Sequence, residues 1–248
     1  MQMKVQAMAL LVAAGLLAAL VVFPALGEDL TAQEILNRTR AAWQGESFHG
    51  VVSLELILSG QTKSHVLEVW TLGDDYALLR VLEPEIDAGS GYLQVKDDLW
   101  YYSPLVGTSI KLPAIALADA IFGSGPSLQD LSQGTLSDDY DVTVEATESG
   151  YFLVLIPHPD APVVYGKLEI RVTGDFVLEE VIYYDQRGEI LRTAVFSNSV
   201  KIGDASFPTE ILIEDASGDR TIQRIENPEF NLTLDPSFFS LDTLEEVQ

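Results

Sequence analysis

Residues 51–58 read Val51-Val52-Ser53-Leu54-Glu55-Leu56-Ile57-Leu58. Positions 52, 54, 56 and 58 are all aliphatic, whereas the positions between them include a serine and a glutamate. Side chains two residues apart point to the same side of a strand, so this alternation predicts a strand with one face toward a core. We therefore expect a protein built from β-strands.

The same pattern recurs along the chain, with turn-forming residues such as Gly73-Asp74-Asp75 and Gly174-Asp175 between the runs. About a dozen short strands joined by tight turns predict a mainly β fold, in which one curved antiparallel sheet forms a half-open β-barrel. No linker divides residues 28–248, which we expect to be a single domain. The further strands are expected at residues 64–72, 76–82, 91–96, 98–103, 142–147, 151–156, 164–172, 177–184, 189–197, 207–214 and 220–226.

A helix should precede the first strand. Thr31-Ala32-Gln33-Glu34 is a capping box, in which the threonine oxygen and the glutamate side chain bond the first free amides of a helix. Leu36, Thr39 and Trp43 follow at helical spacing, and Gly45 ends the pattern. We expect one amphipathic helix over residues 31–43.

A long segment between residues 104 and 139 also departs from the strand pattern. Its apolar, alanine-rich part at 113–122 suits a short helix, and Ser127 is a suitable N-cap for a second one at 127–131. Such an insertion is longer than a connection between strands requires. We expect these helices to cover the concave face of the sheet.

The first 27 residues predict export. Lys4 is followed by an uncharged apolar run at residues 7–23, and Ala25 and Gly27 are small residues suited to a cleavage site. The alternative is an uncleaved membrane anchor, because the run is only slightly short of a membrane span. We favour a cleaved signal peptide and a periplasmic or otherwise exported protein that begins near Glu28. No cysteine follows the run, so the chain has no lipid-attachment site of the lipoprotein type.

Composition excludes several classes of function. The 248 residues include no cysteine, which rules out zinc–thiolate, iron–sulfur and thiol-nucleophile chemistry. The formal net charge is −24, and it becomes −25 if Lys4 is lost with the signal peptide. Nucleic acid is therefore excluded as a partner, since phosphate binding depends on lysine and arginine. Anionic lipid surfaces would also repel the protein, so we expect only transient membrane contact.

Catalytic and metal-binding patterns are weak. The histidines at positions 49, 65 and 158 are too far apart for a local metal motif, and there is no G-x-S-x-G nucleophile motif. Gly123-Ser124-Gly125 suits a hinge better than a nucleophile. Asp138-Asp139-Tyr140-Asp141 lacks the spacing of a calcium loop and is better explained as a solvated turn. We expect no enzymatic activity, no metal and no cofactor.

Several motifs carry a family resemblance. Trp100-Tyr101-Tyr102-Ser103-Pro104, Phe122-Gly123-Ser124 and Asp130-Leu131 resemble the W-x-Y-x-P and F-x-G-S-D-F-S-x-x-D-L signatures of the LolA-like outer-membrane lipoprotein-sorting family. Residues 183–189, Pro208 and residues 235–239 are similar to the closing strands and final turn of that family. The resemblance extends over the whole mature chain. It departs from the family pattern at Gly125 and Pro126, where aspartate and phenylalanine are usual.

The resemblance implies a half-open barrel that encloses an apolar cavity for acyl chains. The partners it implies are an acyl lipid or lipoprotein, an inner-membrane transporter and an outer-membrane acceptor. The leading hypothesis is a non-enzymatic carrier that moves acylated cargo between envelope membranes. The alternative is a lipid-sensing or interaction module of the same fold.

Aromatic residues on strand or helix faces more often pack in a core than line a ligand site, and both readings stay open for the tryptophans. Gly123, Ser124 and Gly125 are expected to be the hinge of the cover. The cavity is expected to be lined by Leu54, Leu56, Trp70, Trp100, Tyr102, Phe122, Leu128 and Leu131.

Overall fold

The computed structural model describes residues 30–113, 116, 122, 139–161, 163–203 and 205–246. The predicted signal peptide, and most of the predicted helical insertion, lie outside these residues. The chain divides into two units, residues 1–30 and 31–248, and all of the helices and strands below belong to the second unit. No helix among the described residues has both the length and the hydropathy needed to cross a membrane.

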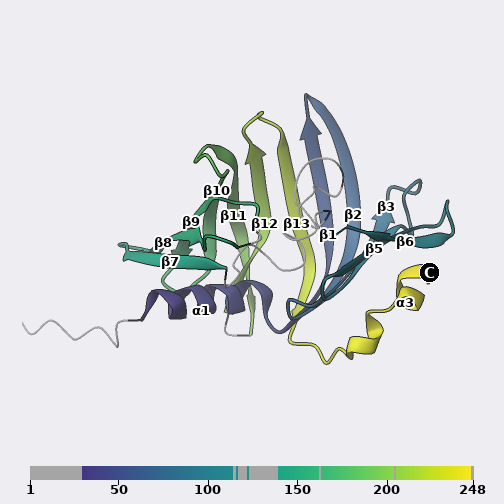
Figure 1. The fold of residues 1–248 in the computed structure, drawn as a ribbon, viewed down its shortest axis with the longest axis horizontal. Helices are drawn as coiled ribbons and strands as arrows, with labels where there is room; N and C mark the ends of the chain where they lie inside the picture. Colours follow the sequence, from purple (N-terminus) through teal and green to yellow (C-terminus); the bar gives the residue numbers. More distant parts are fainter. Residues whose placement is uncertain are drawn as a thin grey trace, which may run out of the picture. The chain divides into compact units, whose positions relative to one another are not determined.

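The fold is a single antiparallel sheet of 13 strands, as expected from the sequence (Figure 1). Helix α1 (Ala32–Gln44) precedes it, and a short 3-10 helix η2 (Pro236–Phe238) and helix α3 (Leu241–Glu245) follow it. The strands are β1 (Ser47–Leu58), β2 (Gln61–Leu72), β3 (Tyr76–Glu83), β4 (Gly91–Val95), β5 (Asp98–Ser103), β6 (Thr108–Leu112), β7 (Tyr140–Ala146), β8 (Gly150–Pro157), β9 (Lys167–Thr173), β10 (Leu178–Tyr184), β11 (Ile190–Ile202), β12 (Ala205–Asp215) and β13 (Arg220–Phe230).

The strand order is β6-β5-β4-β3-β2-β1-β13-β12-β11-β10-β9-β8-β7. It consists of two meanders joined by the pairing of the first strand with the last. The sheet is open, because β6 and β7 form its two edges. They are also consecutive in the chain, so the segment between Leu112 and Tyr140 must connect one edge of the sheet to the other.

Local sequence explains where the first elements begin and turn. The amide of Glu34 donates to Thr31 Oγ1 over 3.2 Å, and the amide of Thr31 donates to Glu34 Oε2 over 2.8 Å, which is the predicted capping box. Ser59 and Gly60 both have positive φ, at 49° and 82°, as a two-residue turn between twisted antiparallel strands requires. That turn sets the register in which Leu58 pairs with Gln61.

Strand β6 was not predicted. It lies between residues 104 and 139, where the sequence departs from the strand pattern. Its sequence, Thr108-Ser109-Ile110-Lys111-Leu112, is short and half polar. It pairs with only one neighbour, β5, because it lies at the sheet edge. Ile110 and Leu112 alternate with Ser109 and Lys111, but two aliphatic positions in five residues are too few to identify a strand from the sequence alone.

The two faces of the sheet differ in character. We call the face that packs against α1 the inner face and the opposite one the outer face. Trp43 of α1 defines the inner face, where its ring stacks on Phe207 at 5.1 Å and meets the edge of Phe196 at 5.3 Å. Paired residues of an antiparallel ladder point to the same side, so the pairings assign every strand residue to one face.

Candidate functional site

The inner face is mainly aliphatic across both meanders, although it also holds the buried polar residues His65, Thr71, Gln94, Thr221 and Gln223. Leu54 and Leu56 of β1 lie on it with exposed fractions of 1% and 0%. Their neighbours on the same face include buried aliphatic side chains from strands of both meanders. These are Val52, Leu67, Val69, Leu79, Val81, Leu99, Leu153, Leu155, Leu168, Ile170, Val181, Ile211, Ile213 and Ile225.

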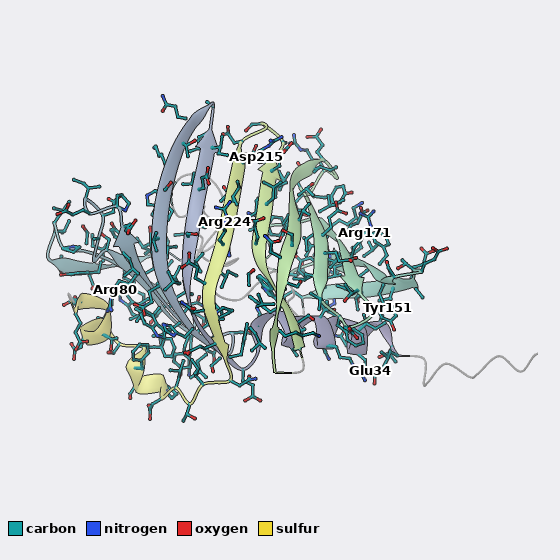
Figure 2. The ribbon with its side chains drawn as sticks, turned by 180° about the vertical axis from the view of Figure 1, so that it is seen from behind. Glu34, Arg80, Tyr151, Arg171, Asp215 and Arg224 are labelled. Carbon is teal, nitrogen blue, oxygen red and sulfur yellow. The ribbon has the colours of Figure 1, made fainter. Side chains whose placement is uncertain are left out.

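The outer face of the central strands is charged instead. Arg224 of β13 pairs with Glu210 of β12 at 2.9 Å and with Glu55 of β1 at 3.5 Å. Farther along the sheet, Arg171 of β9 pairs with Glu180 of β10 (Figure 2). An antiparallel sheet with one solvated face shows this alternation of apolar and polar sides. The apolar side chains gathered on the inner face are therefore the candidate functional surface.

The buried polar side chain of His65 stands out on this apolar face. His65 of β2 pairs directly with Leu54 of β1, and it is 7% exposed. Its Nδ1 atom is buried without a hydrogen-bond partner, and its Nε2 atom lies 3.8 Å from Asp87 Oδ2. Burial lowers the pKa of the imidazole, with Asp87 acting against that shift and Lys63 adding to it. Burial thus favours the neutral form of the ring.

Phe122 is the one predicted lining residue of the insertion that the structure describes. Its ring stacks on His65, with 3.7 Å between centroids and 13° between planes. It therefore lies on the inner face, with His65 and Leu54. Leu128 and Leu131, and the predicted hinge Gly123, Ser124 and Gly125, lie outside the described residues.

The other three predicted lining residues lie on the opposite side of the sheet. Trp70, Trp100 and Tyr102 belong to the outer face, because they pair with Leu78, Leu93 and Gly91 on that side. There they pack with the C-terminal segment in a cluster built around Leu78, Leu93, Tyr102, Phe239 and Leu244. The structure thus brings Leu54, Leu56 and Phe122 together and separates them from the tryptophans.

The C-terminal segment holds its place on the outer face through both apolar and polar contacts. Arg80 Nη2 donates to the carbonyl oxygen of Thr243 over 2.6 Å, and Ser109 Oγ donates to Glu245 Oε1 over 2.7 Å. Arg80 also lies over the ring of Trp70, 5.9 Å from its centroid. The sequence predicted only a final turn at residues 235–239. The spacing of Phe239 and Leu244 after the Asp235 cap was the available sign that it packs on the sheet.

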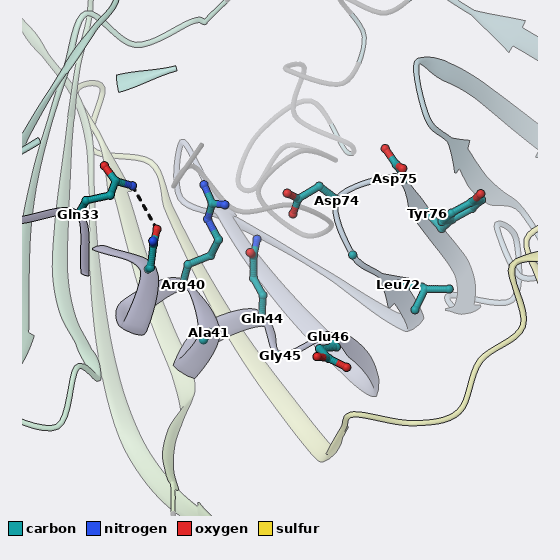
Figure 3. A pocket seen from close by; sticks show the side chains of 12 residues that line it. Gln33, Arg40, Ala41, Gln44, Gly45, Glu46, Leu72, Asp74, Asp75 and Tyr76 are labelled. Carbon is teal, nitrogen blue, oxygen red and sulfur yellow. Dashed lines mark hydrogen bonds between the residues drawn. The ribbon is translucent and has the colours of Figure 1, made fainter. Parts of the chain in front are cut away.

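A half-open cleft of about 830 Å³ lies between α1 and the turn that joins β2 to β3 (Figure 3). Arg40 and Gln44 line it from the helix, and Asp74 and Asp75 line it from the turn. Tyr76 adds one aromatic wall. Seven of its twelve lining residues have amide or charged side chains, so an acyl chain in this cleft would lie against several polar groups. These residues are Gln33, Asn37, Arg40, Gln44, Glu46, Asp74 and Asp75.

The histidines do not assemble a metal or catalytic centre within the described part of the chain. His49 lies on the outer face, 3.0 Å from Glu68 and 3.4 Å from Glu229, and His158 lies 3.3 Å from Asp141. Among residues 30–113, 139–161, 163–203 and 205–246, no group of three or more potential metal-ligating side chains converges.

Comparison with known proteins places this arrangement in a known fold. A family model with the description "-like: Uncharacterized protein" matches residues 73–246. No curated protein matches the sequence. Three of the similar solved structures superpose with TM-scores of about 0.75, and each covers most of the chain.

A LolA superfamily protein from Nitrosomonas europaea is 23% identical, covers 87% of this chain and 100% of its own, and superposes with a TM-score of 0.74. A domain assigned to an outer membrane lipoprotein-sorting protein of Vibrio parahaemolyticus is 18% identical, with 87% and 98% covered and a TM-score of 0.75. A DUF1329 family protein from Desulfovibrio piger is also 18% identical, with 86% and 97% covered and a TM-score of 0.76. The resemblance to LolA-like proteins is therefore confirmed at the level of the fold.

Proposed function

Since this chain belongs to the family matched over residues 73–246 and has the fold of the LolA superfamily, we propose that it is an exported carrier of acylated cargo. In this proposal the protein shelters the acyl chains of a lipid or lipoprotein and delivers them between envelope membranes. An inner-membrane transporter would supply the cargo and an outer-membrane acceptor would receive it. The protein itself performs no chemical reaction.

The largely aliphatic inner face is the observation that carries this proposal. Leu54 and Leu56 lie within a buried aliphatic surface that extends over strands of both meanders. Burying an acyl chain of ordinary length there is worth on the order of 10 kcal/mol, at about 0.8 kcal/mol per methylene. No catalytic group is needed to hold such a ligand. Because these side chains are buried in this structure, uptake must uncover them.

The proposed lining is narrower than the sequence predicted. We assign Leu54, Leu56 and Phe122 to the ligand site, since they share the inner face. Trp70, Trp100 and Tyr102 instead hold the C-terminal segment against the outer face. The proposed roles of Leu128 and Leu131 as lining, and of residues 123–125 as a hinge, stay predictions that rest on the family resemblance.

Charge supports the proposed cycle of loading and release. The net charge of −24 works against lasting adhesion to anionic lipid, and a carrier must leave the membrane after loading. Dissociation of the cargo into water would be slow, so release requires a competing acceptor or an opening of the cover. The cargo is thus held by apolar burial and handed on by exchange.

Native mass spectrometry tests the proposal. The full chain would be expressed, exported and purified without detergent, and its mass recorded under gentle ionisation. We expect a copurifying acyl lipid or lipoprotein peptide. A ligand-free protein that also fails to take up added fatty acid would overturn the carrier proposal. Specific capture of a membrane protein by such lipid-free protein would instead support the interaction-module alternative.

A matched pair of variants localises the binding. Phe122→Asp places a charge on the inner face and should abolish uptake of a fluorescent fatty acid. Phe152→Asp makes the same change on the outer face, where Arg171 lies over the ring at 5.8 Å, and should leave uptake intact. Thermal unfolding of both variants separates loss of binding from loss of folding. Equal loss of uptake in the two variants would argue against an inner-face site.

A further inference from the structure

His65 is buried, and none of the described residues pairs with one of its nitrogens. The side chain is 93% buried beside aliphatic residues such as Leu54, and within the described part of the chain Nδ1 has no hydrogen-bond partner. Buried polar atoms in folded proteins are almost always paired, so an unpaired one points to a group that is missing from the structure. For a site that holds an acylated ligand, the missing group is the polar part of that ligand.

The neighbours of His65 determine which hydrogen-bonding role Nδ1 plays. The carboxylate of Asp87 lies 3.8 Å from Nε2, which is too far for a hydrogen bond but close enough for its negative charge to favour a proton on that nitrogen. A neutral imidazole carries only one N–H. With the proton on Nε2, Nδ1 presents a lone pair and accepts a hydrogen bond. The partner it lacks is therefore a donor.

The surrounding surface fits the junction between an acyl chain and its head group. Leu54 separates His65 from Gln223, which pairs with Leu54 from the other side and is 5% exposed. Phe122 covers one face of the imidazole and leaves the ring edge, where Nδ1 lies, free of that contact. At this level of the sheet, the polar side chains of His65 and Gln223 flank Leu54. The aliphatic surface continues on the Val52 side, where the paired neighbours are Leu67 and Ile225, whereas Leu56 pairs with Lys63 and Thr221.

We propose that His65 recognises the polar group next to the acyl chain of the ligand, and that this group is a hydrogen-bond donor, either an amide N–H or a hydroxyl. This inference rests on the proposed carrier function. It assigns the protein a preference for N-acyl or hydroxylated lipids over simple esters. Nδ1 offers only an acceptor, so an ester, which brings no donor, leaves this atom unpaired.

The test compares two ligands with the same chain, N-methylpalmitamide and methyl palmitate. Each is titrated against the wild-type protein by displacement of a fluorescent fatty acid. We expect the amide to bind at least about tenfold more tightly, a difference of about 1.4 kcal/mol. In His65→Phe that preference should disappear through weaker binding of the amide, with little change for the ester. The variant should fold, because it replaces an unpaired buried polar ring with an apolar one.

His49→Phe is the control variant. It changes the outer-face histidine that stacks on Trp70 at 5.0 Å, and it should keep the wild-type preference for the amide. Equal affinity of the wild type for the two ligands, or a preference that survives in His65→Phe, would overturn the role of His65 and leave the carrier proposal standing. If neither ligand displaces the probe, the carrier proposal fails and this inference fails with it.

Discussion

Replacing Phe239 by alanine tests whether the outer-face cluster is structural or binds ligand. Phe239 is 4% exposed, and its ring lies 5.4 Å from Tyr76 and 5.3 Å from Phe238. Removing a buried phenylalanine ring typically costs about 3–5 kcal/mol of unfolding free energy, from lost burial and the cavity left behind. For a domain of this size each kcal/mol lowers the Tm by roughly 2–4 °C, so we expect a fall of about 6–20 °C.

The assay is urea unfolding monitored by tryptophan fluorescence, followed by fatty acid uptake under conditions where the variant is folded. Uptake should be unchanged, because Phe239 packs on the face opposite to Leu54 and Leu56. Leu241→Ala is the matched control: this side chain lies in the same segment but is 40% exposed, so its loss should change stability by about 0.5 kcal/mol or less. A stable Phe239→Ala variant that no longer takes up fatty acid would refute this division between the two faces.

Three further predictions concern the scaffold and the inner face. Thr31→Ala removes the N-cap of α1 and should cost about 1 kcal/mol in urea unfolding; no change would mean that the capping box is not formed in solution. Gly150→Ala should destabilise the protein by about 1–3 kcal/mol, because the added Cβ would lie 2.0 Å from a carbonyl oxygen of β9. Gly174→Ala should be tolerated, because the nearest atom to its Cβ lies 3.8 Å away, and equal urea unfolding midpoints for the two variants would contradict this prediction. The folded-state pKa of His65 lies below its ordinary value of 6.5, so the unfolded state binds more protons and the free energy of unfolding should fall as the pH drops below about 6.5. His65→Leu should reduce this pH dependence when the free energy of unfolding is measured between pH 7.5 and 5.

The architecture could be predicted from the sequence because most strands show a local alternation of apolar and polar residues and are joined by short turns. The alternation in residues 51–58 correctly predicted that Val52, Leu54 and Leu56 are buried, whereas Leu58, next to the turn, is only partly buried. The capping box at Thr31 and Glu34 formed as expected. Tight turns such as Ser59-Gly60 favour antiparallel pairing of neighbours in the chain. Of the strand pairings formed by the described residues, only that of β1 with β13 joins strands far apart in the sequence.

The candidate site was harder to predict, since it depends on which face each side chain occupies. In β2 both faces are apolar, with Leu67 and Val69 inside and Trp70 outside, because the C-terminal segment covers the outer face there. In such a strand, the alternation of residue types does not tell which of the two faces is the inner face. The motif around Trp100 and Tyr102 correctly indicated a LolA-like fold, but their packing in the cluster that contains Leu244 is a contact between distant parts of the chain.

Photolabelling with a palmitic acid analogue that carries a diazirine near the chain end tests the central claim, that the inner face holds the acyl chain. The labelled residues would be identified by tandem mass spectrometry, with unlabelled palmitic acid as competitor. The account predicts saturable, competed labelling at inner-face positions, chiefly Leu54, Leu56 and Phe122. Saturable labelling at Trp70 or Trp100 with none on the inner face would contradict it.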